Sequence, residues 1–201
     1  GLALTGVVAM VTASSETMLN AIFGTPLSWV VMLAPLAFVL VLLFGINKLS
    51  TPAAQGLFWA FAFVMGLSMA SIFMIYTGTS IARVFFISAS MFAGMSLYGY
   101  TTKRDLSGFG SFLMMGLIGL IIAMVVNIFL KSSALEFIIS AAGVLIFVGL
   151  TAYDTQKIKA IYSAMDDKDV MAKKAIMGAL TLYLDFINLF MMMLRLFGDR
   201  R

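Results

Sequence analysis

The chain has 201 residues, of which 62% are hydrophobic and 11% charged, and its mean hydropathy of +1.07 excludes a water-soluble globular domain. It contains no Cys and no His, so disulfides, cysteine nucleophiles and the commonest metal ligand of proteins are excluded. The net charge of +4 comes from Lys and Arg in short segments between apolar runs, which indicates membrane topology and not nucleic-acid binding.

Seven apolar runs follow one another along the chain, each close to the roughly 20 residues that cross a bilayer core. They cover residues 2–23, 27–46, 53–76, 81–100, 109–130, 134–153 and 175–197. We therefore predict an all-α membrane protein, a single domain over residues 1–201 built as a seven-transmembrane-helix bundle. Because the chain starts at Gly1 directly in an apolar run, we expect a short polar segment before it in the full protein, and no cleavable signal.

Lys and Arg in the short loops indicate the orientation of the bundle. If the first helix starts in the cytoplasm, Lys48, Lys103 and Lys157 fall on the cytoplasmic side and Lys131 falls on the opposite side. The C-terminal tail departs from this rule, because seven full spans place its arginines outside; they are Arg195, Arg200 and Arg201. A re-entrant last segment with the tail inside is therefore the alternative to a full crossing.

Asp185 is the ionisable residue that lies deepest in an apolar run. It lies about 11 residues, roughly 16 Å, into the last run, so its short side chain cannot reach the membrane surface. A charge in hydrocarbon costs about 2.5 to 3.5 kcal/mol on insertion scales, which predicts that Asp185 faces the interior of the bundle. Thr181 and Asn188 lie on the same helical face, so we expect a polar seam along the last helix.

Three further ionisable residues lie within runs or at their ends. Asp154 ends the sixth run, and its spacing alone allows either an interfacial pair with Lys157, three residues later, or a functional role. Glu16 and Arg83 have opposite charges and similar expected depths near the outer surface, so they are a candidate buried pair. An Arg83 that extends to the surface is the alternative.

Two segments that contain the aspartates are Tyr153-Asp154-Thr155-Gln156-Lys157-Ile158-Lys159 and Leu182-Tyr183-Leu184-Asp185-Phe186-Ile187-Asn188-Leu189-Phe190. Together they resemble the signature motifs of the Bax inhibitor (transmembrane Bax inhibitor motif) family. The resemblance extends to Lys103-Arg104-Asp105-Leu106-Ser107 and to Phe61-Ala62-Phe63, so it covers nearly the whole chain. The compact length and short loops resemble the bacterial branch, which implies a multi-pass protein of a bacterial inner membrane.

The resemblance implies a last helix held centrally by the other six, with Asp154 and Asp185 facing each other as a pH-sensing and gating pair. It also implies a calcium-permeable leak pathway whose activity depends on pH, and in some bacterial members the binding of a membrane-bound protease. A basic residue in the loop after the second helix contributes in some members. The nearest equivalent here is the lone Lys48.

Elementary electrostatics supports such a pair, because two carboxylates in a low-dielectric site cannot both ionise cheaply and tend to share one proton. When both are ionised, their oxygens suit Ca²⁺, and Thr181 and Asn188 could add ligands. We therefore expect H⁺ and Ca²⁺ to compete for Asp154 and Asp185. Ca²⁺ is then a permeant ion held transiently, and we expect no resident cofactor.

Other functions of multi-span proteins fit less well. A retinal protein needs a Lys inside its last helix, and residues 175–197 contain none. A membrane metallohydrolase normally needs His, so we do not expect an enzyme. The remaining alternative is a membrane interaction protein that modulates a membrane-bound protease or another partner without conducting ions, through lipid-facing surfaces or the loop between Lys157 and Lys174.

Overall fold

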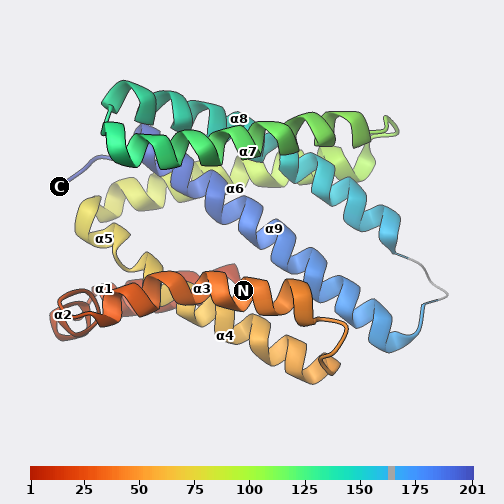
Figure 1. Cartoon of the computed structure of the whole chain (residues 1–201), viewed down its shortest axis with the longest axis horizontal. Helices are drawn as coiled ribbons and strands as arrows, with labels where there is room; N and C mark the ends of the chain where they lie inside the picture. The colour runs from red at the N-terminus through yellow and green to blue at the C-terminus, as the bar shows by residue number, and fades with distance from the viewer. Residues whose placement is uncertain (163–165) are drawn as a thin grey trace. The chain divides into compact units, whose positions relative to one another are not determined.

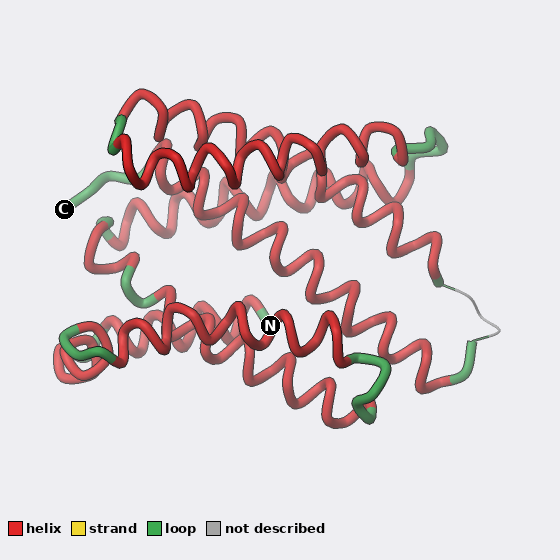
Figure 2. Tube along the Cα trace, viewed as in Figure 1, coloured by secondary structure: helices red, strands yellow, loops and turns green. Residues whose placement is uncertain are grey.

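The computed structural model describes residues 1–162 and 166–201. Within them the chain consists of helices joined by short loops (Figures 1 and 2), and the one strand-like feature is an isolated bridge between Tyr76 and Arg200. The helices are α1 (Leu2–Ala13), α2 (Glu16–Phe23), α3 (Leu27–Gly45), α4 (Thr51–Met69), α5 (Ile72–Ile75), α6 (Gly78–Thr101), α7 (Ser107–Leu130), α8 (Ser133–Ile161) and α9 (Lys168–Phe197). The predicted all-α class is confirmed.

The first apolar run does not form one straight helix. It breaks at Ser14 and Ser15 into α1 and α2, which are bent by 100° relative to each other. The Ser14 hydroxyl donates to Val11 O at 2.8 Å, and Ser15 Oγ accepts from Met18 N at 3.3 Å, so these side chains end one helix and cap the next. The break places Glu16 in the first turn of α2, where it is exposed and where the helix dipole favours an acidic group.

In the described part of the chain, six segments are long and apolar enough to cross a membrane, and the bent pair α1–α2 makes a seventh if it is counted as one span. The six are α3, α4 with α5, α6, α7, α8 and α9. The seven-helix prediction is thus confirmed apart from the break in its first member. Of these segments α9 is the most buried, with 61% of its apolar window buried against 11 to 39% elsewhere, as expected for a central last helix.

The contacts between helices define two compact units, and the first comprises Gly1–Thr77, α9 as far as Leu180, and Arg200–Arg201. In this unit α4 packs against both α1 and α3. The backbones of α1 and α4 approach closely at Gly66, where an added Cβ would lie 2.8 Å from Thr5 O. The Thr5 hydroxyl also donates to a carbonyl of α4 at 2.8 Å, so a polar group ties α1 to its neighbour.

The second unit comprises Gly78–Tyr162 and Thr181–Asp199, so α9 contributes to both units. In it α8 packs against α6 and α7, and Figure 1 shows α7 and α8 side by side. The backbones of α6 and α8 come very close at Gly99, where an added Cβ would lie 2.1 Å from Ala152 O. A small residue at this position is what allows the two helices to touch.

Within the second unit α9 runs antiparallel to α6. Just beyond the end of α9, the Asp199 N–H donates to Ser80 Oγ at the start of α6, at 2.8 Å. Further back along α9, Phe186 packs edge-on against Phe92, which lies further along α6, with ring centroids 5.5 Å apart. Because α9 follows α6 in the opposite direction, the structure favours a full crossing of the last helix over a re-entrant segment.

Candidate functional site

A cavity of about 440 Å³ lies between α7, α8 and α9 in the second unit, and we call it the aspartate cavity. It is lined by Met114, Leu117, Ile121 and Met124 of α7, by Phe147, Leu150, Tyr153, Asp154 and Lys157 of α8, and by Thr181, Leu184, Asp185, Asn188 and Met192 of α9. Its wall on α7 is apolar, and its polar and charged groups come from α8 and α9. Four residues singled out from the sequence, Asp154, Asp185, Thr181 and Asn188, therefore line one cavity, while their roles stay predictions.

Asp154 of α8 and Asp185 of α9 both line the aspartate cavity. Asp185 is only 5% exposed, whereas Asp154 is partly exposed. Among the residues that the structure describes, Asp185 Oδ2 has no hydrogen-bond partner. A buried acceptor left unpaired costs about 1 to 3 kcal/mol, so this oxygen is a candidate position for a proton or a cation.

The lengths of α8 and α9 explain how two aspartates from different parts of their apolar runs can meet. The sequence placed Asp154 at the end of its run, near the membrane surface. In the structure α8 continues to Ile161, so Asp154 lies inside the helix. In the same way α9 begins at Lys168, ahead of its apolar run, and Asp185 lies near its middle. The helices are longer than the hydrophobic runs because their polar ends continue the same backbone hydrogen bonding.

Thr181 and Asn188 flank Asp185 along α9, and both line the aspartate cavity. Asn188 Nδ2 donates to Leu184 O at 2.8 Å, so its amide oxygen is the atom that can act as a ligand. Lys48 lies in the first unit, exposed between α3 and α4. Its supporting role stays a prediction.

The wall that α7 contributes to the cavity was not predicted from the sequence. Its four lining residues are Met114, Leu117, Ile121 and Met124, and their spacing of three and four residues forms one helical face. This spacing is visible in the sequence, but α7 is apolar on every side, so the pattern does not tell which face points inward. The Tyr153 ring was also missed; it packs directly on Gly110 of α7, where an added Cβ would lie 2.4 Å from it.

A second pocket, of about 430 Å³, lies beside the connection between α6 and α7, and we call it the loop pocket. It is lined by Lys103, Asp105, Ser107, Tyr153, Gln156, Lys157, Ala160 and Ile161. Gln156 ties this connection to α8, because its Nε2 donates to Arg104 O at 2.8 Å and its Oε1 accepts from Leu106 N at 2.9 Å. Hydrogen bonds from the hydroxyl and the N–H of Ser107 hold the pKa of Asp105 below its ordinary value, so Asp105 stays ionised.

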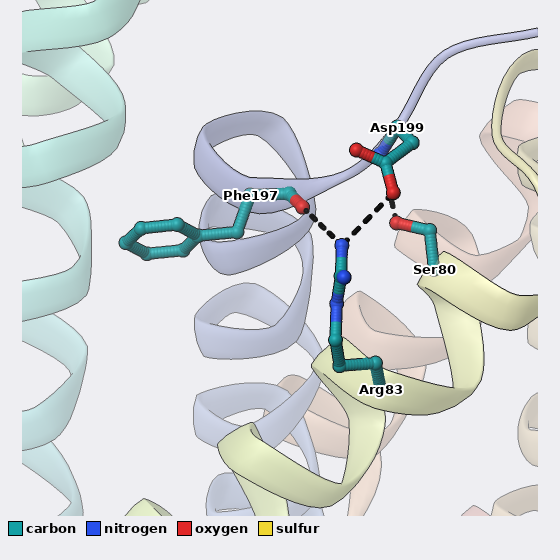
Figure 3. Close-up of polar contacts among 4 residues, drawn as sticks. All are labelled: Ser80, Arg83, Phe197 and Asp199. Carbon is teal, nitrogen blue, oxygen red and sulfur yellow. Dashed lines mark hydrogen bonds and ion pairs between the residues drawn. The ribbon is translucent and has the colours of Figure 1, made fainter.

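Arg83 has a partner that the sequence analysis did not foresee (Figure 3). Its Nη2 lies 2.9 Å from Asp199 Oδ2 and also donates to Phe197 O at 3.4 Å. The pairing of Arg83 with Glu16 stays a prediction. Within its own unit Glu16 is exposed at the start of α2, and in the second unit the chain beyond α9 brings Asp199 to the start of α6.

Comparison with known proteins places the whole chain in one sequence family. Residues 1–201 match the family model described as inhibitor of apoptosis-promoting Bax1. Inner membrane protein YbhL of Escherichia coli is 50% identical, with all of this chain aligned to 87% of that protein. Protein RP147 of Rickettsia prowazekii is 51% identical, over all of this chain and 85% of that protein, and a protein of Deinococcus radiodurans is 40% identical, over all of this chain and 86% of that protein.

Proposed function

Because the chain belongs to the family of inhibitors of apoptosis-promoting Bax1 and is a multi-pass protein of the bacterial inner membrane, we propose that it is a pH-sensitive, calcium-permeable leak pathway gated by Asp154 and Asp185. The observation that carries the proposal is the buried Asp185 Oδ2, which lacks a partner within the described residues and lines a cavity together with Asp154. Such an oxygen is stabilised by whatever positive species reaches it, whether a proton or a cation.

The mechanism is a competition between H⁺ and Ca²⁺ for the same oxygens. Two carboxylates in an apolar cavity repel each other when both are ionised, so one proton shared between them is the favoured state at high proton concentration. Ca²⁺ stabilises the doubly ionised state, and its occupancy of the aspartate cavity therefore increases as pH rises. Cation passage thereby becomes dependent on pH.

The small number of acidic groups suits a permeant ion better than a stored one. In the described residues no cluster of three or more Asp, Glu, His or Cys side chains could hold a metal. Ca²⁺ prefers six to eight oxygen ligands, so two carboxylates with the Asn188 amide oxygen give only weak, transient binding. A weak site lets the ion leave as well as enter, as conduction requires. We accordingly propose a transport role and no catalysis.

The test is Ca²⁺ flux through the purified chain in liposomes, measured from pH 5 to 8. Asp185→Asn removes the charge and keeps the size, so it abolishes the pH dependence of flux, and Asp154→Asn does the same. The double variant adds little to either single one, because removing one carboxylate already relieves the repulsion between the two. Asp199→Asn, which removes an exposed carboxylate at the end of α9, is the control and keeps the wild-type pH profile.

Both single variants retaining wild-type flux and an unchanged pH profile would exclude the gating role of the two aspartates. The interaction of this chain with a membrane-bound protease would then be the function to pursue.

A further inference from the structure

The aspartate cavity and the loop pocket share part of their walls. Tyr153 and Lys157 line both. They lie four residues, about one helical turn, apart on α8, with Asp154 between them in the sequence. The two pockets are therefore adjacent at these two side chains.

The two residues of this shared wall differ in their freedom to move. The Tyr153 ring is packed closely against Gly110, as its short distance to an added Cβ shows. Lys157 is exposed, and its Nζ lies 6.0 Å from the Tyr153 ring centroid. The ring is thus a fixed part of the wall, whereas the lysine is a long side chain with few constraints.

Lys157 is the positively charged side chain in the lining of the aspartate cavity, which also contains two aspartates. The charged side chains that line the aspartate cavity are Asp154, Asp185 and Lys157, and α7 adds only apolar ones. Lys103, Asp105 and Lys157 are the charged side chains that line the loop pocket. Lys157 lies three residues beyond Asp154 on α8, about one helical turn away.

Lys159, two residues further along α8, offers a contrast. Its Nζ donates to Tyr100 O at 2.7 Å and lies 4.5 Å above the centroid of the Tyr100 ring. Its charge is held there by a carbonyl and an aromatic face, and it lines neither cavity in the described structure. Lys157 and Lys159 are therefore the same residue type on the same helix, and only Lys157 lines the two pockets.

We propose that Lys157 is a selectivity residue, whose ammonium limits cation passage between the aspartate cavity and the loop pocket. This inference rests on the proposed leak function and assigns a further residue to it. The energy of an ion in the field of a fixed charge is proportional to the charge of the ion. Lys157 therefore opposes Ca²⁺ twice as strongly as K⁺, and it lowers the ratio of Ca²⁺ to K⁺ flux.

The experiment compares Lys157→Gln with Lys159→Gln in liposomes, with Ca²⁺ and K⁺ flux measured separately at pH 7 and low ionic strength. An exposed charge of this kind changes the flux of a monovalent ion by about threefold, so Lys157→Gln raises K⁺ flux about threefold. Ca²⁺ carries twice the charge, so its flux rises about tenfold. The fold-change for Ca²⁺ is close to the square of that for K⁺. Lys159→Gln keeps wild-type flux and ratio, and Lys157→Arg, which keeps the charge, keeps both as well.

A single-cysteine variant removes any ambiguity from folding, because the chain contains no other Cys. Lys157→Cys conducts like Lys157→Gln, and a positively charged methanethiosulfonate reagent returns the same protein to the lower Ca²⁺ to K⁺ flux ratio. An unchanged ratio in Lys157→Gln, or no response of Lys157→Cys to the reagent, overturns the assignment of Lys157. If in the same series Asp185→Asn has lost its pH dependence, the leak function stands and only this inference fails. No flux through the wild-type chain overturns both.

Discussion

Arg83 and Asp199 form an ion pair with side chains that are 55% and 66% exposed, whereas the neighbouring Ser80 is only 1% exposed. Exposed ion pairs contribute about 0 to 1 kcal/mol to stability, because water screens the charges and the long side chains lose conformational entropy. A buried hydroxyl that accepts a backbone N–H contributes more, since its removal leaves a donor without a partner. At the scale of single residues, burial therefore decides which contact at the end of α9 matters.

From this difference we predict an order of stability for two variants. Arg83→Ala lowers the free energy of unfolding by less than about 1 kcal/mol. Ser80→Ala removes the acceptor of Asp199 N–H and lowers it by about 1 to 3 kcal/mol. Thermal melting in detergent measures the stability of both variants. Asp199→Asn is the control, because it removes the charge of the ion pair and keeps the backbone N–H that binds Ser80. An Arg83→Ala protein that melts below Ser80→Ala would show that the ion pair, and not the hydroxyl, holds this end of α9.

Residue patterns predicted the α9 side of the candidate site but not the contacts of the tail. The spacing of Thr181, Asp185 and Asn188 places them on one helical face whatever the helix packs against, and all three line the aspartate cavity. Asp199 follows the last apolar run, and its position next to Arg83 depends on where α6 begins in space. No local pattern carries that information, so the partner of Arg83 could not be found from the sequence.

Close packing of helices depends on glycines at particular positions, and α6 contains a matched pair of them. At Gly99 an added Cβ would meet the Ala152 carbonyl oxygen of α8, whereas at Gly94 it would meet nothing within 4 Å. Both lie within the same helix, with Gly99 in its last turn. At the scale of elements, comparing substitutions at these two glycines separates two changes in the free energy of unfolding. One comes from overpacking between helices, and the other from replacing a glycine in any helix.

We predict that Gly99→Ala lowers the free energy of unfolding by roughly 1 to 3 kcal/mol, because α6 and α8 must move apart. Gly94→Ala leaves it unchanged or raises it by up to about 1 kcal/mol, since alanine loses less backbone entropy in a helix. Unfolding of the purified proteins in a denaturing detergent gives both values. Equal stability of the two variants would mean that α6 and α8 are not in backbone contact at Gly99.

Helix existence was predictable from hydropathy, and helix ends were not. The seven runs gave the right elements, but hydropathy averages over the break between α1 and α2, because the residues on both sides of it are apolar. A local signal was present there, since Ser15 followed by Glu16 is a typical helix start. The polar ends of α8 and α9 were missed for the opposite reason, because a helix continues where hydrophobicity stops.

At the scale of the whole molecule, the direction of each helix in the second unit relates the loops to the two sides of the membrane. Lys103 and Lys157 line one pocket at the end of α6, and Lys131 follows α7 at its far end. Since α9 is antiparallel to α6, its C-terminal end lies with the start of α6. From the positive-inside rule we predict that the basic loops face the cytoplasm and that the C-terminus faces the opposite side.

We predict that cysteines introduced at Lys103 and Lys157 react with an impermeant thiol reagent from the cytoplasmic side only. Cysteines at Lys131 and Gly198 react from the opposite side only. Labelling of right-side-out and inverted vesicles gives the comparison, and the absence of native Cys provides a clean background. Position 198 labelled from the same side as position 103 would restore the re-entrant model of the last helix.

The thioethers in the wall of the aspartate cavity make it a target for oxidants. The chain has 17 Met and no Cys, so methionine is its only oxidisable sulfur. Met114, 47% exposed, is open to attack, whereas Met192, 4% exposed, is shielded. Conversion of Met114 to the sulfoxide adds a strong dipole to the apolar part of the wall that α7 contributes. Peroxide would thus alter the surroundings of Asp154 and Asp185 while leaving both carboxyl groups chemically intact, and methionine sulfoxide reductases could reverse the change.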